Sequence, residues 1–447
     1  SITPHANVGR SHVYLSACLR HAFSIYILLP FHQSLITNPH CGPHPVLHPA
    51  LDAGSPDSRN LTNHESRITN YIHHMTSKRK IINDPVYDGF LSIDDPVILS
   101  VIEHPFFQRQ RRIKQLGLTY LVYPGAMHTR FSHMLGALNL MGRALEVLQL
   151  KGVEITADEC RGAKMAILLH DIGHGPFSHT SERVLVDIPH EEITLRMMQR
   201  INDEMDGALD TAIAIFTNAY PKHFLHQLVS SQLDMDRLDY LGRDSFFTGV
   251  SEGIVGTDRI ISMLNVHDDE LVVDEKGIYS VEKFIISRRL MYWQVYMHKT
   301  VIAADQLLLN IIRRARDIDE SVFRFDTESQ DFLDKFAEVD DDDVMVAVKR
   351  WQHSSDDILK RLCHSLVNRR LPAIRIGNAP FHGSENGDYF SGTGVLRNRS
   401  YDFNDQEIKV LYKDGRCVSI SEASDQLDRH FLEKQVTKYF MYKPKGV

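Results

Sequence analysis

Apolar residues recur at helical spacing along most of the chain between residues 75 and 317. Apolar side chains three and four positions apart predict amphipathic helices, and four segments show this spacing: Ile98–Gln115, Ser132–Leu150, Asp158–Asp171 and Phe284–Ala315. The first is broken near Pro105, because proline lacks the amide that a helix interior needs. The second ends at Lys151-Gly152, a natural helix stop. We therefore expect a helical core over residues 75–317.

Shorter segments carry the patterns of strands. Leu271–Val281 alternates apolar and polar residues around Lys276-Gly277 and predicts a small hairpin. Leu371–Ile376 and Ile408–Ile420 also indicate strands, and the second of these turns at Asp414-Gly415. The predicted fold class is mainly α, with a helical core and a smaller mixed α/β region over residues 318–447.

The first 74 residues differ in composition from the rest. They hold 10 of the 25 histidines and 7 of the 17 prolines, but no lysine and only three acidic residues. The composition changes abruptly at Met75, which begins Met-Thr-Ser-Lys-Arg-Lys. We interpret residues 1–74 as a non-native extension read through from a misplaced start; the alternative is a genuine disordered tail. Its most apolar stretch, Ala22–Phe31, is too short to span a bilayer.

Charge and cysteine usage narrow the function classes. A net charge of -8 argues against a protein that coats nucleic acid through its overall field, although a local basic groove for phosphates stays compatible with it. The five cysteines form no Cys-x-x-Cys pair, which argues against a cysteine zinc site and a disulfide framework. We expect a soluble, cytoplasmic protein without a membrane partner.

One local string carries the strongest chemical signal. Residues 168–179 read LLHDIGHGPFSH, in which a helix ends at His170-Asp171 and a glycine-rich turn follows. A metal site needs further ligands, and His133 upstream and Asp236 downstream supply an imidazole and a carboxylate. Two nitrogen and two oxygen ligands from three helices suit Mn, Fe, Ni, Zn or Mg, and ligand type does not choose among them. A lone His-Asp pair would carry no weight, so the prediction depends on the whole set.

Several motifs in the same order resemble a known family. The strings RFSH, HDIGHGPFSH and LDMDRLDYLGRD resemble the HD-domain deoxynucleoside triphosphate triphosphohydrolases, which include dGTPase-like enzymes. The resemblance is dense over residues 80–315 and loose afterwards. It implies a helical HD core and hydrolysis of a dNTP to the deoxynucleoside and inorganic triphosphate. We expect no sterile-alpha-motif domain, which some members carry, ahead of Met75.

The resemblance also implies a role for each matching residue. The metal ligands would be His133, His170, Asp171 and Asp236, holding one divalent ion, with additional Mg accompanying the nucleotide. The catalytic group would be His174, supported by Glu182 and His190. The substrate-binding residues would be Gln115, Arg130, His179, Arg237, Tyr240, Asp244, Arg288 and Tyr296. Elementary chemistry agrees, because a triphosphate in an acidic protein needs local cations and a general acid for its leaving oxygen.

Three positions depart from the family pattern. Glu182 stands where the family has Asp, and Arg237 stands where it has Lys, so charge is kept but geometry changes. Glu103 also replaces an expected Asp, in an activator site that the resemblance places at Lys80, Ile81, Glu103 and Arg111. A carboxylate there can accept hydrogen bonds from a guanine edge, which predicts GTP or dGTP as activator of a homo-oligomer, either a dimer or a tetramer.

Other readings stay open at the level of sequence. Another HD phosphohydrolase chemistry would act on nucleoside monophosphates, cyclic nucleotides or alarmones. A different class of protein, regulatory and binding nucleotides or single strands without turnover, is disfavoured by the net charge and by the intact ligand set. For single residues, Tyr240 and Tyr296 fit core aromatics equally well, and Glu103 with Arg111 fits a solvated helix face.

Overall fold

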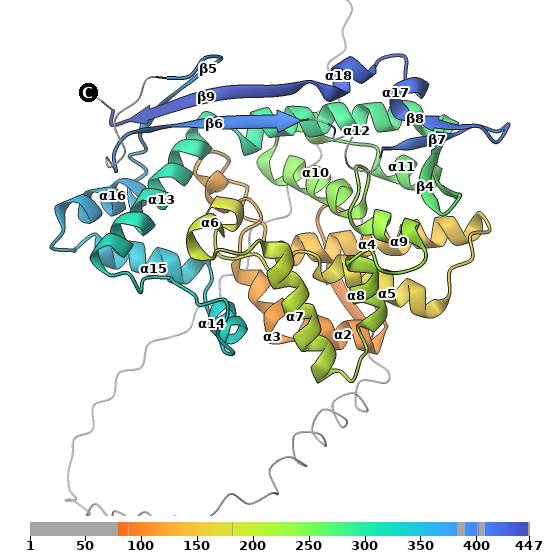
Figure 1. Ribbon diagram of the computed structural model, residues 1–447, viewed down its shortest axis with the longest axis horizontal. Helices are drawn as coiled ribbons and strands as arrows, with labels where there is room; N and C mark the ends of the chain where they lie inside the picture. Colours follow the sequence, from red (N-terminus) through yellow and green to blue (C-terminus); the bar gives the residue numbers. More distant parts are fainter. Residues whose placement is uncertain are drawn as a thin grey trace, which may run out of the picture. The chain divides into compact units, whose positions relative to one another are not determined.

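The structure is a computed structural model that describes residues 79–87, 89–180, 182–381, 389–399, 401 and 407–445. Within these residues helices predominate, and the strands form three small sheets (Figure 1). The expected fold class, a mainly α helical core with a smaller sheet-containing C-terminal region, is confirmed. The extension that we expect at residues 1–74 lies outside the described residues.

Three helices form the centre of the core: α4 (Arg130–Leu150), α5 (Ala157–Leu169) and α10 (Met235–Thr248). Helix α4 packs against both others and buries an apolar face that includes Leu140, Met141 and Ala144. A capping box of Thr156 and Glu159 starts α5 by satisfying free amides of its first turn. Asp234 caps the start of α10 in the same way. The start of α10 and the end of α5 matter most, because candidate metal ligands lie there.

Shorter helices surround this centre. They are α2 (Pro96–Glu103), α3 (Pro105–Gln108), η1 (Arg109–Arg112), η2 (Gly117–Leu121), η3 (Ser178–Thr180), α6 (Glu182–Leu185), α7 (His190–Glu204), α8 (Asp210–Phe216), α9 (His223–Val229), η4 (Ser251–Gly253) and α11 (Thr257–Met263). The predicted segment Ile98–Gln115 thus forms two helices and a 3-10 turn, with the break at Pro105 where it was expected. Ahead of them, β1 (Lys80–Asn83) pairs with β2 (Phe90–Ile93).

The prediction of one helix over Phe284–Ala315 is wrong. The chain forms α12 (Ile278–Met291), a π-helical turn η6 (Tyr292–Tyr296) and α13 (Lys299–Ile318). His298 has an extended backbone, and its side chain accepts from the Thr300 amide, which starts a new helix. An unbroken apolar pattern on both sides of His298 concealed this cap.

The prediction of a hairpin over Leu271–Val281 is wrong, because only the first part of this segment forms a strand, and that strand pairs with residues before it. Strands β3 (Leu264–His267) and β4 (Glu270–Asp274) pair antiparallel around Asp268 and Asp269, which both have positive φ. Aspartate tolerates this conformation better than most residues. Lys276-Gly277 instead belongs to the 3-10 turn η5 (Glu275–Gly277), which leads directly into α12.

The C-terminal region adds helices and two groups of strands. The helices are α14 (Phe332–Glu338), α15 (Asp341–Trp351), α16 (Asp357–Val367), α17 (Ile420–Ala423) and α18 (Arg429–Glu433). The strands are β5 (Ala373–Gly377), β6 (Gly392–Arg399), β7 (Lys409–Leu411), β8 (Cys417–Ser419) and β9 (Gln435–Lys443). Sheet order is β5-β9-β6 in one sheet and β3-β4-β7-β8 in another. The predicted turn at Asp414-Gly415 is confirmed, and Gly415 takes the left-handed conformation there.

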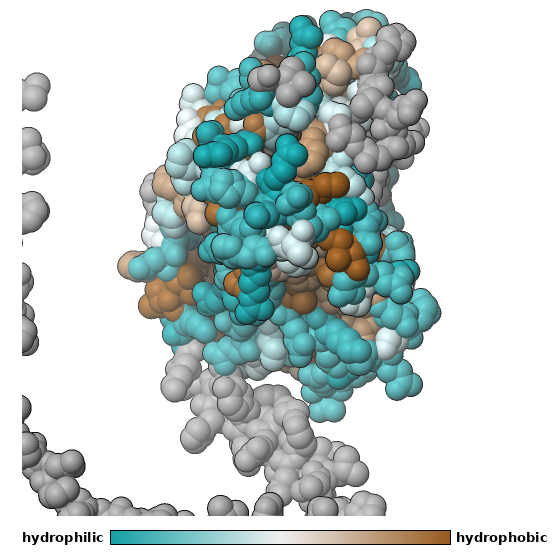
Figure 2. Space-filling model, turned by 90° about the vertical axis from the view of Figure 1, so that its left-hand side faces the viewer, coloured by the Kyte–Doolittle hydropathy of each residue, from teal (hydrophilic) through white to brown (hydrophobic). Residues whose placement is uncertain are grey.

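The face that carries α15 and α16 is covered mainly by hydrophilic side chains, with small hydrophobic groups between them (Figure 2). Exposed apolar residues such as Val346 and Ile376 occur singly in the sequence of this region, which is normal for a protein surface. Among the described residues, no helix is both long and apolar enough to cross a membrane.

Candidate active site

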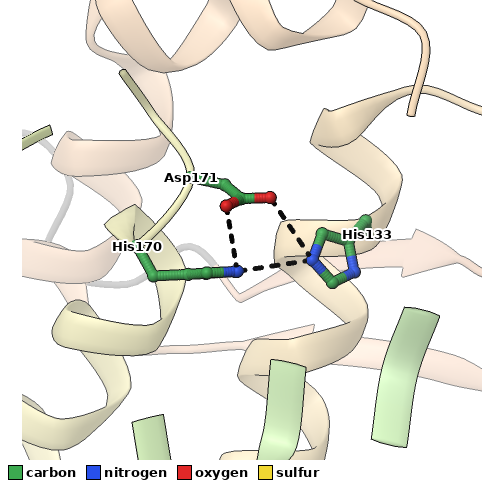
Figure 3. A group of neighbouring side chains, drawn as sticks. All are labelled: His133, His170 and Asp171. Carbon is green, nitrogen blue, oxygen red and sulfur yellow. Dashed lines mark hydrogen bonds and ion pairs between the residues drawn. The ribbon is translucent and has the colours of Figure 1, made fainter. Parts of the chain in front are cut away.

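Four ligand atoms from three helices meet at one point of the core. His133 lies in the first turn of α4, His170 and Asp171 follow α5 directly, and Asp236 lies in the first turn of α10. His133 Nε2 lies 3.4 Å from His170 Nε2 and 3.7 Å from an oxygen of Asp171 (Figure 3). Asp236 Oδ1 lies 3.0 Å from His133 Nε2 and 3.3 Å from His170 Nε2.

These separations match the ligand shell of a metal ion. Ligands about 2.1 Å from one cation lie roughly 3.0 to 3.5 Å from one another in tetrahedral or octahedral arrangements. His133 Nδ1 donates to Asp239 at 2.7 Å, and His170 Nδ1 donates to the carbonyl of Ile167 at 2.6 Å. With a cation bound, the proton would stay on Nδ1 of both rings, and both Nε2 lone pairs would be left for the cation. Such a convergence of acceptor atoms fits a divalent cation.

The electrostatics of the cluster also favour positive charge at its centre. Burial disfavours the charged form of His133, but hydrogen bonds with Asp236 and Asp239 outweigh it and raise its pKa to about 10. Burial likewise opposes ionisation of Asp236, yet the charge of His170 and the hydrogen bond with His133 hold its pKa below the usual range. A divalent cation supplies the charge that these groups would otherwise take from protons.

A second histidine pair adjoins the cluster. His174 is buried, and its Nε2 lies 3.5 Å from Asp171 Oδ1. The rings of His174 and His190, which begins α7, are stacked with centroids 3.7 Å apart. Asp171, His174 and His190 could themselves hold a cation. Since His170 also faces Asp171 Oδ1 at 3.5 Å, this oxygen links the two groups.

The loop after His174 takes its shape from packing and not from flexible glycines. Gly173 and Gly175 do not take a left-handed conformation; the left-handed residues of the loop are Phe177 and Ser178, with φ of 55° and 49°. Gly173 is needed for a different reason: a side chain there would approach the backbone oxygen of His190 to 2.3 Å. Helix α5 ends at Leu169, directly before the His170-Asp171 pair.

Distant residues hold this strained loop in place. The Phe177 amide donates to the buried Asp341 at 2.7 Å, and the Lys114 amide donates to the same carboxylate at 3.0 Å. Arg130 Nε donates to Ser178 Oγ at 2.9 Å, while Nη1 of the same guanidinium donates to Asp171. Left-handed backbone at residues other than glycine persists only where the surroundings enforce it, and these bonds do so.

A cavity of about 400 Å³ opens beside the cluster. Asp171, Asp236, His174 and His190 form part of its wall. The wall also contains five of the residues expected to bind substrate: Gln115, Arg130, Tyr240, Asp244 and Tyr296. Its size lies within the usual range for a small-molecule site.

The other expected substrate residues are placed differently. Among the described residues, neither Arg237 nor Arg288 lines the cavity. Arg237 donates to the Ser231 carbonyl, and Arg288 lies near Gln232 and the ring of Tyr292. The side chains of His179 and Glu182 lie outside the described part of the structure. Their expected roles therefore stay predictions.

The residues expected to bind an activator lie partly together. Lys80 Nζ and Glu103 Oε1 form an exposed ion pair at 3.3 Å, so β1 meets the end of α2. Ile81 is 58% exposed, so its side chain is accessible to a ligand. The Arg111 guanidinium lies over the ring of Phe131 at 3.5 Å.

Sequence reasoning missed several residues of the cavity and its support. Thr180, Tyr292 and Asp305 line the cavity. His128 Nε2 and the Tyr296 hydroxyl hold the two oxygens of Asp244, at 2.8 and 2.7 Å. Asp340 and Asp341 are the buried members of the acidic run 340–343, and only the fold shows that Asp341 braces the loop. The remaining residues carry no local signal.

Comparisons with known proteins agree with this geometry. Residues 130–244 match the HD domain family, and residues 255–377 match the family described as HD associated region. An uncharacterized protein of Bacillus subtilis, YwfO, is 34% identical over 311 residues, which cover 66% of this chain and 71% of that protein. The crystal structure of a phosphohydrolase from Bacteroides thetaiotaomicron is similar with a TM-score of 0.78 and 43% identity, covering 82% of this chain and all of that one.

Two more distant relatives carry the name deoxynucleoside triphosphate triphosphohydrolase SAMHD1 or its homolog. The Dictyostelium discoideum protein is 28% identical over 321 residues, 67% of this chain and 58% of its own. The human protein is 29% identical over 288 residues, 54% of this chain and 45% of its own. The chain belongs to the HD-domain phosphohydrolase family with an HD-associated region, to which these dNTP triphosphohydrolases are related.

Proposed function

We propose that this protein is a metal-dependent triphosphohydrolase that converts a dNTP to the deoxynucleoside and inorganic triphosphate. The observation that carries the proposal is the four-ligand cluster opening into a cavity that also presents Arg130 and His174. The names of the SAMHD1 relatives support the choice of substrate. A bound divalent cation would polarise the α-phosphate and lower the pKa of a coordinated water.

The chain's own residues would divide the remaining work. Arg130 is fixed by Ser178 and Asp171, so its guanidinium reaches the cavity without having to be ordered when a phosphate binds. His174 would donate a proton to the leaving oxygen, because its ring adjoins Asp171 and the cavity. His190 stacks on His174 and would fix its ring plane. Glu182 would help keep His174 protonated.

The sugar and base would lie toward the tyrosines. Asp244 accepts from His128 and Tyr296, which fixes the carboxylate for a sugar hydroxyl. Gln115 Oε1 is buried with no hydrogen-bond partner among the described residues, and a base or sugar donor would satisfy it. Tyr240 packs edge-on against Tyr296 and would flank the sugar. His179, Arg237 and Arg288 would hold the phosphates, the two arginines once their side chains turn toward the cavity.

Product analysis tests the proposal directly. Purified protein is incubated with dGTP and Mn²⁺, and the phosphorus products are identified by ³¹P NMR. We expect inorganic triphosphate and deoxyguanosine. Pyrophosphate or monophosphate would instead indicate another HD phosphohydrolase chemistry, and the dNTP triphosphohydrolase assignment would be abandoned.

We also propose that a guanine nucleotide activates a homo-oligomer of this chain through Lys80, Ile81, Glu103 and Arg111. Lys80 could bind a phosphate and Glu103 a guanine edge once a nucleotide separates their ion pair. Titrating GTP against dTTP hydrolysis should give a sigmoidal rise in rate and a larger species in analytical ultracentrifugation. Hyperbolic kinetics that do not respond to GTP would contradict activation.

A further inference from the structure

A fully buried carboxylate stands directly behind the metal ligand His133. Asp239 Oδ2 accepts from His133 Nδ1 at 2.7 Å and from Arg243 Nε at 2.8 Å. Its other oxygen accepts from Arg243 Nη2 at 2.9 Å and from the Tyr87 hydroxyl at 2.6 Å. Both oxygens of Asp239 are therefore surrounded by donors, and their orientation is fixed.

The same contacts extend to a distant part of the chain. Arg243 is buried and donates to both oxygens of Asp84, at 2.7 and 3.2 Å. Asp84 and Tyr87 lie between β1 and β2, about 150 residues before Asp239 in the sequence. The segment that joins these two strands is thus connected to the metal ligand through buried hydrogen bonds.

A glycine in helix α4 leaves the space that Asp239 and Arg243 occupy. Gly136 lies one turn after His133, and a side chain there would come within 2.0 Å of Asp239 Oδ1 and 2.1 Å of Arg243 Nη2. The acceptor is also specific. Hydrogen-bond donors face both oxygens of Asp239. If asparagine replaced it, the NH₂ group of the amide would face one of these donors in either orientation of the side chain.

We propose that Asp239, Arg243 and Asp84 are positioning residues that hold the proton on Nδ1 of His133. Segment 84–87 would thereby contribute to metal binding, although it supplies no ligand. The inference rests on the proposed metal centre but not on the choice of substrate. With Nδ1 protonated, the Nε2 lone pair points at the cation. Arg243 shares its charge between two carboxylates, so Asp239 keeps enough negative charge to orient the ring.

This arrangement predicts effects of opposite sign. Asp239→Asn would place the amide NH₂ group against Nδ1–H of His133, which favours the Nε2–H tautomer. Because that tautomer has no Nε2 lone pair for the cation, metal binding should weaken by roughly 10- to 100-fold. Asp84→Asn leaves Arg243 to neutralise Asp239 alone, which should weaken binding by about 3- to 10-fold. Tyr87→Phe removes a donor from Asp239 without removing charge, so affinity should stay equal or rise.

The test measures metal affinity independently of turnover. Mn²⁺ binding to the full chain is titrated by electron paramagnetic resonance, and Co²⁺ absorption reports the ligand geometry. Asp356→Asn is the matched control, because Asp356 pairs with Arg314 through two hydrogen bonds of 3.1 and 2.5 Å but has no contact with His133. The control should lose stability and keep the wild-type affinity and spectrum.

The outcomes separate this inference from the proposed function. Weaker binding in Asp239→Asn and Asp84→Asn, with none in Tyr87→Phe or the control, supports the positioning role. Unchanged affinity in Asp84→Asn, or equal losses in all four variants, overturns it while the metal centre stands. A wild-type chain that binds no Mn²⁺ overturns the metal centre and the inference together. If Asp239→Asn does not fold, the contrast between Asp84→Asn and Tyr87→Phe decides.

Discussion

His174 lies close to the proposed metal ligands but is assigned a different role. Substitution of His174 should therefore affect catalysis without affecting metal binding. His174→Asn should lower kcat by about 10²- to 10⁴-fold, because the leaving oxygen loses its general acid, while metal content stays unchanged. Steady-state kinetics and elemental analysis of the purified variant measure both quantities. His223→Asn, at the start of α9, is the control and should match the wild type. Loss of metal together with activity would show that His174 is a ligand.

Asp305 is an acidic group in the wall of the cavity, and its environment should be visible in stability. Burial raises its pKa to about 7, despite a hydrogen bond from Thr180 at 3.0 Å. The folded chain therefore keeps a proton that the unfolded chain loses near pH 4. The contribution of Asp305 to stability is fully present below pH 4 and is lost as the pH rises through 7. Asp305→Asn should reduce the fall in unfolding free energy between pH 5 and 8 by about 2 kcal/mol. Urea unfolding at the two pH values measures it; identical pH dependence in both proteins would refute the assignment.

At the scale of elements, the sequence located the helices better than the breaks between them. Helices α4 and α5 were predictable because apolar spacing, the stop at Gly152 and the start near Asp158 agree. The break at His298 was not, because its evidence is a single cap within a continuous apolar pattern. The bracing of Phe177 by Asp341 was also hidden, since 164 residues separate the partners.

The close approach of α4 and α10 gives a prediction about Gly136. Gly136→Ala should lower the free energy of unfolding by about 3 kcal/mol or force the helices apart, because its side chain would meet Asp239 at 2.0 Å. Gly142→Ala on the same helix is the control: its side chain would meet only the flexible end of Lys164, at 3.5 Å. This control should gain up to about 1 kcal/mol from helix propensity. Denaturant unfolding compares them, and equal effects would contradict the packing described.

The contact between α15 and the loop after His174 gives a second prediction at this scale. Asp341→Ala removes the acceptor for the Phe177 and Lys114 amides, so stability should fall by about 1 to 3 kcal/mol. The KM for substrate should rise several-fold, because Ser178 anchors Arg130. Asp342→Ala, an exposed neighbour on the same helix, is the control. A normal KM in Asp341→Ala would show that the loop keeps its shape without this brace.

At the scale of the whole molecule, the candidate site gathers residues from most of the described chain. The four candidate ligands could be identified in the sequence because each lies in a compact motif at a helix end. The supporting residues could not, because Tyr87, Asp305 and Asp341 reach the site only through tertiary packing and lack a local pattern. Domain boundaries stay a prediction, although β7 of the C-terminal region pairs directly with β4 of the core.

Reconstitution with metal tests the central claim most directly. The protein is stripped with a chelator, desalted and titrated with Mn²⁺, while triphosphate released from dGTP is measured at each step. Because the proposed chemistry needs the cation, and a ligand that binds only the folded chain stabilises it, the stripped protein should be inactive and melt a few degrees lower. We expect triphosphate formation to return in proportion to tightly bound metal and to level off at one ion per chain. Full activity in the stripped protein, or metal-dependent release of monophosphate in place of triphosphate, would contradict the account.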